Sequence, residues 1–461
     1  LTQILAKFLR NTKYEYNHGR CFNIHRVKIG PVISLILRHF YNKIVGKAMN
    51  RMRNFMVFGV CLLLSAVVLQ SCGKKETGQL VGVLDRPKWK GINPFGMQYI
   101  KSGVFHIGGN DQDIFNSFVQ RPRQVSIVGF FMDETEITNN EYRQFVNYVR
   151  DSTAHTILGD FIQDDYGNES IDWELPIDYA DETLDEMYVS EDDQIFGKRE
   201  FDNTNLRYAW TEVDWVKAAH SPKTPRSQLV RKFEVPIYPD TLVWIRDFAY
   251  SYNDPLARNY FWHPAYDDYP VVGVNWQMAQ AFCDWRTKMW NRYRPDERHS
   301  EGFRLPTEYE WEYAARGGHD LSSYPWGGYY LRNAKGCLLA NFKPGRGNYA
   351  DDGAQYTTRV DYYFPNDYGL YQMAGNVSEW TVSAYYDNAN NIIHDLNPDV
   401  KYYAQQDDPD VLKRKVIRGG SWKDIGYYLQ CGVRDWEYQD STKSYIGFRC
   451  VITNLGRTLT E

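Results

Sequence analysis

One long apolar run, from Phe55 to Leu69, constrains this chain more than any other feature. It follows a short basic stretch that contains Arg51 and Arg53, and it is too short to cross a bilayer comfortably as a permanent helix. We interpret residues 49–71 as a secretory signal peptide. No second run is long enough to span a membrane, so the residues beyond it are expected to bury a sizeable core, as one large or two ordinary domains.

The end of this run carries a second signal. Ser71, a small residue, stands directly before Cys72, as in a bacterial lipobox, where the signal is cut ahead of the cysteine and the sulfur receives a lipid. Acyl chains contribute about 0.8 kcal/mol per buried CH₂ and would anchor a domain without a spanning helix. No aspartate follows Cys72, which favours the periplasmic face of the outer membrane. The alternative is an ordinary signal peptide with a chance cysteine.

The remaining boundaries follow from composition. Residues 1–48 precede the signal and begin with leucine, so we interpret them as a non-native upstream extension. Residues 72–92 form a tether, because the stretch before Asn93 is rich in Gly, Pro and Lys with little periodicity. Residues 93–455 form the folded domain, with an insertion at about 151–246.

Composition restricts both the fold and its partners. Aromatic residues make up 16% of the chain, beside 34 Gly and 19 Pro, which favours a fold of loops and short strands. The net charge of -5 argues against nucleic acid as a partner. Four of the seven cysteines lie beyond the lipid site, at positions 283, 337, 431 and 450. Their spacing alone leaves all three full disulfide pairings open.

Local patterns predict several elements. Tyr99–Gly109 suggests a strand and a glycine turn, and Val125–Met132 a second strand. Thr138, with Glu141 three residues later, predicts a capped helix start. Residues 270–274 are strand-like, and Trp276–Trp290 carries apolar residues at helical spacing.

The insertion is acidic first and basic later. Carboxylates are dense from Asp160 to Asp193, and a basic patch runs from Lys217 to Lys232. It is either a solvated excursion or a docking surface. Its tryptophans are the first places to look for protein contacts, although each one alone is more often a core residue: Trp173, Trp210, Trp215 and Trp244.

Five motifs then occur in a fixed order: Phe303–Gly318, Tyr324–Gly327, Tyr368–Trp380, Arg418–Trp422 and Ile446–Cys450. Together they closely resemble the formylglycine-generating-enzyme, or sulfatase-modifying-factor, family. The resemblance implies an α+β fold of that family's type, related to C-type lectins and rich in loops and short strands. Pro306 suits the first turn of a helix, and Arg304, Arg316 and Arg449 would support loops by bonding to carbonyls and carboxylates.

The resemblance also addresses catalysis. Family members that make formylglycine bind copper through two cysteines shortly after the Arg-Gly-Gly-Ser motif. Here the first position is Asp424, and the second is Leu429 or Gly426, depending on the direction of counting. The chain also lacks the helical domain with histidine ligands of the iron-dependent members. We therefore expect no enzyme activity, no catalytic residue and no copper. Cys431 matches a structural cysteine whose partner position is Ala315.

Two further site predictions rest on the resemblance alone. Cys283 and Cys450 match two cysteines that are bonded to each other in the enzymes, with free buried thiols as the alternative. Calcium is the implied structural cofactor, because the matching groups are carboxylate, amide and backbone oxygens. One set is Asn341, Phe342, Asp352 and Ala354; the other is Gln372, Gly375, Val377 and Glu379.

A narrower resemblance concerns Gln79–Val83, Asn93–Met97 and Asp133–Val146, which are similar to the GldK/PorK lipoproteins. It implies a non-catalytic scaffold of the type IX secretion and gliding-motility machinery, which self-associates into periplasmic rings with a GldN/PorN-like protein. The related GldJ lipoprotein is one alternative. A lipoprotein that binds glycan or peptidoglycan through exposed Trp and Tyr is another, and an intact oxidase is a third.

Overall fold

The computed structural model describes residues 92–109, 121–163, 167, 169–247, 256–294 and 301–455. The described residues all belong to one compact unit, residues 89–461. The predicted upstream extension, signal peptide, Cys72 and nearly all of the tether lie outside the described residues. Within the described part, no helix is both long enough and apolar enough to cross a membrane.

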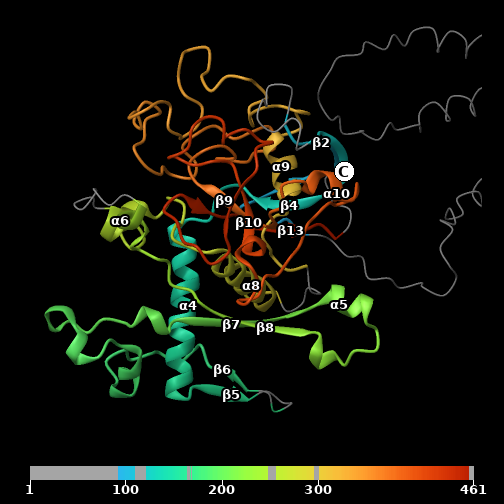
Figure 1. The fold of residues 1–461 in the computed structure, drawn as a ribbon. Helices are drawn as coiled ribbons and strands as arrows, with labels where there is room; N and C mark the ends of the chain where they lie inside the picture. The colour runs from blue at the N-terminus through green and yellow to red at the C-terminus, as the bar shows by residue number, and fades with distance from the viewer. Residues whose placement is uncertain are drawn as a thin grey trace, which may run out of the picture. The chain divides into compact units, whose positions relative to one another are not determined.

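The two largest sheets among the described residues have three and four strands (Figure 1). The first has the antiparallel order β1-β4-β13, from Met97–Ile100, Phe130–Asp133 and Val451–Thr453. The second has the order β11-β10-β9-β12, from Asp435–Tyr438, Arg414–Arg418, Ser378–Ala384 and Ile446–Gly447, and β12 is parallel to β9. A hairpin pairs β2 (Gly103–Ile107) with β3 (Arg123–Ile127). Strand β4 therefore joins the first and last strands described.

Helix α4 (Asn139–Leu158) begins where the sequence predicts. The Thr138 hydroxyl accepts a hydrogen bond from the Glu141 N–H at 3.2 Å, and the Glu141 carboxylate accepts one from the Thr138 N–H at 2.8 Å. This reciprocal pair is a capping box, which satisfies two amide groups that no helical carbonyl reaches. The helix ends at Gly159, whose φ of 78° is left-handed.

Two more helices flank the core. Helix α8 (Trp276–Arg292) is capped by Asn275, whose side chain accepts from the Met278 N–H. Helix α9 (Glu308–Arg316) is capped by Thr307, and its acidic first turn complements the helix dipole. Pro306 therefore lies one residue before the cap and not in the first turn, because the Thr307 side chain already satisfies the Glu310 N–H.

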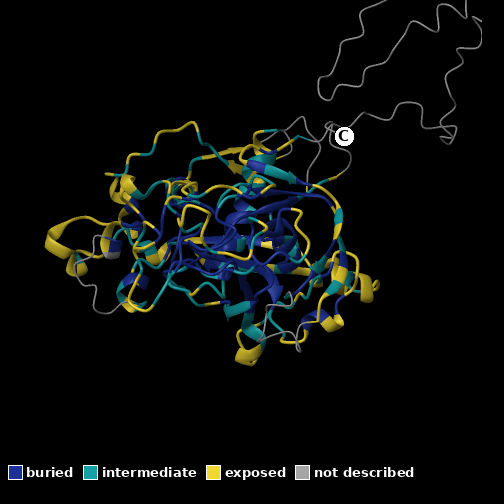
Figure 2. Cartoon of the chain, turned by 90° about the horizontal axis from the view of Figure 1, so that it is seen from above, coloured by how far each residue is buried: buried dark blue, intermediate teal, exposed yellow. Residues whose placement is uncertain are grey.

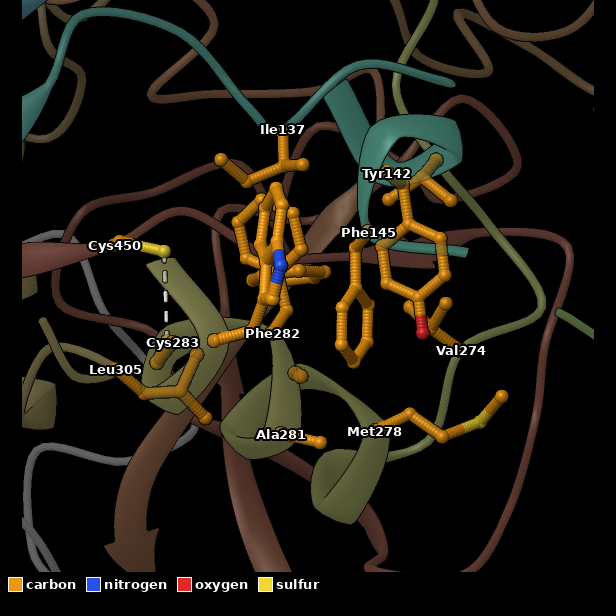
Figure 3. Close-up of a cluster of buried hydrophobic side chains, with 14 of the residues drawn as sticks. Ile137, Tyr142, Phe145, Val274, Met278, Ala281, Phe282, Cys283, Leu305 and Cys450 are labelled. Carbon is orange, nitrogen blue, oxygen red and sulfur yellow. Dashed lines mark hydrogen bonds between the residues drawn. The ribbon is translucent and has the colours of Figure 1, made fainter. Parts of the chain in front are cut away.

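The main core includes side chains of α4, α8 and both sheets, and Figure 3 shows part of it. Tyr142 stacks on Phe282 with ring centroids 5.7 Å apart, and Phe145 meets the same ring edge-on at 5.8 Å. Figure 2 shows that buried residues gather in the middle of the domain while exposed ones lie on outlying loops. The regular elements are short, as the composition predicts: no described strand exceeds seven residues.

Residues 159–246 form the elements of the insertion. Two hairpins, β5 (Phe161–Gln163) with β6 (Glu169–Ile171) and β7 (Arg207–Val213) with β8 (Val230–Pro236), frame it. Helix α5 (Trp215–His220) lies at the turn of the second hairpin, which packs against α8 (Figure 1). Single 3₁₀ turns occupy Glu182–Met187, Glu191–Asp193, Ile195–Gly197, Asn203–Asn205 and Arg226–Gln228.

The other elements are short helices in the connections. Three are α-helical: α6 (Val243–Asp247), α7 (Leu256–Asn259) and α10 (Ala389–Ile392). Two are 3₁₀ turns, Pro264–Tyr266 and Asp410–Lys413. They leave long irregular stretches on either side of β9, in agreement with the predicted loop-rich fold.

Two expectations about elements differ from the structure. Residues 270–274 do not form a strand, because Gly273 turns the chain at φ 74° and only Pro270 makes an isolated bridge. Residues 125–132 form two strands in different sheets, β3 and β4, because the Val128 and Gly129 N–H groups between them donate to the Asn397 and Ser102 side chains. The insertion start at about residue 151 stays a prediction, and α4 continues past that position to Leu158.

Candidate functional site

The Arg-Gly-Gly-Ser segment forms a tight turn at the end of β10. Gly419 and Gly420 have φ values of 92° and 65°. A Cβ on Gly419 would lie 3.1 Å from the Trp311 ring, and one on Gly420 would lie 2.9 Å from the Tyr428 backbone. Both glycines are therefore required by conformation and by close contact. The turn places Ser421 and the residues after it against the core.

Asp424 occupies the first position at which the family's enzymes carry a thiolate. Its carboxylate accepts hydrogen bonds from the Ser421 N–H at 3.0 Å and from the Ser421 hydroxyl at 2.5 Å. Burial raises the pKa of Asp424, and the Ser421 bonds oppose that shift. The Asp424 carboxylate therefore stabilises the turn. Its oxygen atoms are hard ligands, whereas Cu(I) prefers soft sulfur ligands.

Neither alternative for the second position can supply a thiolate. Leu429 is fully buried in an apolar cluster with Phe342 and Tyr324. A Cβ on Gly426 would lie 2.4 Å from the Leu331 side chain, so even a cysteine there would require Leu331 to move. The described cysteines are Cys283, Cys337, Cys431 and Cys450, and none follows Ser421 at the expected spacing.

Cys431 lies beneath this turn in a network of charges. Burial raises the pKa of its thiol to about 12, so it is protonated at neutral pH. Arg418 donates to the Cys431 carbonyl at 3.1 Å and to the Glu312 carboxylate at 2.6 Å. Glu312 also accepts from Arg316 at 2.6 Å. This buried triad holds β10 to α9 and accounts for the arginines around Cys431 without a catalytic role.

The loop-supporting roles expected of three arginines are confirmed. Arg304 pairs with Glu310 through two bonds of 2.6 and 2.7 Å. Arg316 donates to the carbonyls of Ser322 at 2.8 Å and Gly108 at 2.6 Å. Arg449 pairs with Glu379 at 2.6 and 2.7 Å and also donates to the Tyr371 carbonyl at 2.9 Å. The bonds from Arg316 to Gly108 and from Arg449 to Glu379 and Tyr371 join segments that are distant in sequence.

Sequence reasoning missed a buried carboxyl, Glu136. It is fully buried and accepts from Asn376 Nδ2 at 2.8 Å and from the Val377 N–H at 3.4 Å. Burial first, and then the nearby Glu379, raise its pKa well above the usual range. In the sequence, Glu136 is distinguished only by its position before Ile137 and Thr138. A single Glu at such a position does not indicate a buried carboxyl.

The first predicted calcium set is brought together. Asp352 is buried, and its two oxygens accept from the Phe342 N–H at 2.7 Å and the Ala354 N–H at 3.2 Å. Burial raises its pKa, and among the described residues it forms no ion pair with a basic side chain. Asn341 donates to the Tyr356 carbonyl at 2.8 Å. Asp352 is the one anionic side chain of the four residues, and calcium binding at this set stays a prediction.

The second set fits less well. Both Glu379 oxygens are engaged by Arg449, and one also accepts from Trp311 Nε1 at 2.7 Å. Gln372 donates to the Arg359 carbonyl at 3.2 Å, while its buried Oε1 has no partner among the described residues. Gly375 and Val377 contribute backbone to the same turn. A cation here would compete with Arg449 for Glu379, so we restrict the calcium hypothesis to the first set.

Cys283 and Cys450 lie side by side in the main core (Figure 3). Their sulfur atoms are 3.5 Å apart, and both residues are buried. Burial raises the pKa of Cys450 well above its usual range. The two are therefore neighbours, as the resemblance implies, and their disulfide stays a prediction.

Three of the four insertion tryptophans are packed. Trp210 is buried against Phe233, with ring centroids 4.9 Å apart. Trp173 stacks on Tyr148 of α4 at 4.8 Å, and Trp244 stacks on Trp422 at 5.9 Å. Trp215 differs, because it is 75% exposed on α5. Trp215 is therefore the one of the four that is free to contact a partner.

A cavity of about 320 Å³ opens beside the first calcium set. Its lining combines four tyrosines and one arginine with the backbone between Gly353 and Thr358: Tyr266, Tyr269, Tyr356, Tyr362 and Arg359. Arg359 pairs with Asp361 at 3.1 Å and Asp268 at 3.6 Å. A volume of this size, aromatic walls and few charges are typical of sites for small ligands.

The fold and the site together define a class of protein: a mixed α and β domain with short strands, in which the Arg-Gly-Gly-Ser turn packs on the core and Asp424 braces it. The model of the sulfatase-modifying factor enzyme 1-like domain matches residues 90–454. The chain belongs to this family.

The relatives include active and inactive proteins. The formylglycine-generating enzyme of Mus musculus is 28% identical over 368 residues, covering 77% of this chain and 74% of the mouse protein. The inactive C-alpha-formylglycine-generating enzyme 2 of Bos taurus is 35% identical over 189 residues, covering 40% of this chain and 50% of the bovine protein. Among solved structures, PvdO from Pseudomonas aeruginosa aligns over 78% of this chain and 94% of its own, with 16% identity and a TM-score of 0.42.

Proposed function

We propose that this protein is a non-catalytic lipoprotein scaffold of the periplasmic ring in the type IX secretion and gliding-motility machinery, in the manner of the GldK/PorK lipoproteins that its sequence resembles. The observation that carries the proposal is the replacement of the thiol pair. Asp424 stands at the first position, and its carboxylate accepts a hydrogen bond from Ser421. The second position is Leu429 or Gly426, and Leu331 occupies the space that a side chain at Gly426 would need. The domain therefore has the family's fold without the two thiolates that the family's enzymes use.

Two sequence features support the remainder of the proposal. The Ser71-Cys72 motif supports lipidation and placement on the periplasmic face of the outer membrane. The exposed part of the insertion supports docking, because Trp215 stays free when the other insertion tryptophans are packed. The partners would be a GldN/PorN-like protein and further copies of this chain.

The first experiment is a pull-down in mild detergent through a C-terminal tag, followed by mass spectrometry and electron microscopy. We expect ring-shaped particles that contain a GldN/PorN-like protein in stoichiometric amounts. A lone lipoprotein in the eluate would contradict the scaffold function. The same spectra would test Cys72, because a lipid-modified peptide should begin at that residue and no peptide from residues 2–47 should appear.

A second experiment addresses catalysis directly. The protein is incubated with a cysteine peptide of the sulfatase type, copper and oxygen, with an active formylglycine-generating enzyme as the positive control. We expect no conversion of cysteine to formylglycine, because no thiolate pair is available to hold the metal. Copper-dependent conversion above background would refute the non-catalytic assignment.

A second candidate function is glycan binding, which the tyrosine-lined cavity favours. A sugar has an apolar C–H face that can lie on an aromatic ring and hydroxyls that need both donors and acceptors. The tyrosines and the Arg359 ion pairs offer both kinds of partner. Calorimetric titration with chitotriose tests whether this cavity binds a glycan. Binding that is lost in Tyr362→Ala and retained in Tyr330→Ala, an exposed tyrosine outside the cavity, would support it.

A further inference from the structure

The insertion carries two exposed segments of opposite charge. The acidic segment, residues 178–193, has eight Asp and Glu and no Lys, Arg or His. The basic arm, residues 215–232, has five Lys and Arg and no Asp or Glu. All eight carboxylates belong to exposed residues, and within the described part only one of them, Asp185, is paired with a basic side chain, at 2.5 Å from Arg199. Their charges are therefore largely uncompensated within one copy.

The two segments lie at different ends of the β7–β8 hairpin. The acidic segment packs on α4 through Leu184 and Met187 and leads into the start of β7. The basic arm lies beyond the other end of that strand and includes α5 (Figure 1). Seven residues of extended chain span roughly 20 Å. Since β7 separates them, the two segments cannot neutralise each other in one molecule.

Each segment also has exposed apolar side chains beside its charges. On the basic arm, Trp215 and Val216 are 75% and 68% exposed. Directly after the acidic segment, Ile195 and Phe196 are 64% and 93% exposed. Apolar anchors surrounded by complementary charge are typical of protein interfaces. The match in both charge and apolarity indicates that the partner of each segment is the other segment.

We propose that the basic arm of one copy binds the acidic segment of the next copy. Such a contact is head-to-tail: a bound pair leaves one arm and one acidic segment free for further copies, so the assembly grows and closes into a ring if the rotation per step allows it. The proposal rests on the self-association that is part of the proposed function, and it names the surfaces that make it.

Two charge reversals test the contact in the full chain, purified in detergent and measured by analytical ultracentrifugation. One variant is Lys223→Glu/Arg226→Glu, and the other is Glu191→Lys/Asp192→Lys; all four residues are exposed, and none of these side chains forms a hydrogen bond or an ion pair with another described residue. Each variant alone should remain monomeric, because the contact loses most of its attraction: the formal charge falls from +5 to +1 on the basic arm, or from -8 to -4 on the acidic segment. An equimolar mixture should form heterodimers, because the unchanged basic arm of one variant meets the unchanged acidic segment of the other.

Matched controls carry the same charge changes outside the insertion, Lys101→Glu/Lys335→Glu and Glu301→Lys/Asp407→Lys. They should assemble like the wild type. High salt should dissociate the wild type, because the screening length falls to about 3 Å at 1 M. Assembly of either reversed variant alone, or a mixture that stays monomeric while circular dichroism shows folded protein, would overturn the proposal.

The test separates this contact from the wider function. A wild-type chain that stays monomeric alone, but forms rings in the pull-down with its partner protein, would overturn only the copy-to-copy contact. Loss of binding to vesicles of anionic lipid in Lys223→Glu/Arg226→Glu, with unchanged self-association, would also overturn it and would assign the arm to the membrane surface.

Discussion

Arg449 shows how much of this domain depends on single buried charges. Its bonds to Glu379 and to the Tyr371 carbonyl join β9 to two distant loops. Arg449→Met should destabilise the protein by about 3–5 kcal/mol, because it leaves Glu379 buried without its counter-charge. The exposed pair Arg332–Asp351 provides the control, since Arg332→Met should change stability by less than about 1 kcal/mol. Urea denaturation measures both; equal effects would contradict this account.

Lys415 makes stability depend on pH. It is fully buried, its ammonium lies 3.9 Å from the Trp276 ring centroid, and it donates to the Tyr402 carbonyl. Burial lowers the pKa of Lys415 to about 7, with Asp399 opposing the shift. The unfolded chain keeps this proton to about pH 10.4, so above pH 7 the unfolded state binds more protons than the folded state. Stability contributed by this residue therefore rises with pH from about 7 to 10.

Lys415→Met removes the titrating group and tests that sign. The unfolding free energy of the wild type should rise relative to the variant between pH 7 and 9, by on the order of 1 kcal/mol per pH unit. Lys335→Met, at an exposed lysine, should run parallel to the wild type. A difference between wild type and Lys415→Met that does not vary with pH would contradict the expectation.

At the scale of elements, the start of α4 depends on a local device. Thr138→Ala removes the side chain that accepts from Glu141 N–H and should cost about 1 kcal/mol. Thr156→Ala lies on the exposed side of the same helix and should cost nothing, because alanine has the higher helix propensity. Thermal unfolding of both variants measures the difference. A larger loss in Thr156→Ala would be inconsistent with capping.

The β7–β8 hairpin and its connection carry one tryptophan that packs in the core and one that is exposed for docking. Trp210 is 3% exposed, whereas Trp215 lies on the basic arm. Trp210→Ala should therefore destabilise the domain by about 3–5 kcal/mol. Trp215→Ala should leave stability within about 0.5 kcal/mol and should weaken self-association instead. Chemical denaturation together with sedimentation distinguishes them, and a large stability loss in Trp215→Ala would place that residue in the core.

These elements also show what a sequence can predict here. The Thr138 cap, α8 and the fold of the motif-bearing half depend on local residue order, so they were predictable. The turn at Gly273 and the division of residues 125–132 into two strands depend on contacts with residues that are distant in the chain, so they were not. The same holds for the site. The absence of a thiol pair after Ser421 is visible in the sequence, whereas the Leu331 contact with Gly426 and the burial of Glu136 require the structure.

At the scale of the whole molecule, calcium binding at the first set should increase the stability of the folded domain. The first set contains a buried carboxylate with backbone donors only, so bound Ca²⁺ should raise the melting temperature relative to chelator. A hundredfold excess over Kd adds about 2.7 kcal/mol. Asp352→Asn should abolish the shift, and Asp351→Asn, an exposed neighbour that pairs with Arg332, should retain it. An unchanged shift in Asp352→Asn would exclude this set as the binding site.

The β1-β4-β13 sheet has a consequence for how the domain is made. Its middle strand pairs with residues 97–100 on one side and 451–453 on the other. This sheet stays incomplete until residues 451–453 pair with β4, and contacts of such long sequence separation form slowly. A chain truncated before residue 451 should lack one of the two neighbours of β4 and be more sensitive to proteolysis. Limited proteolysis therefore reports whether both neighbours of β4 are in place.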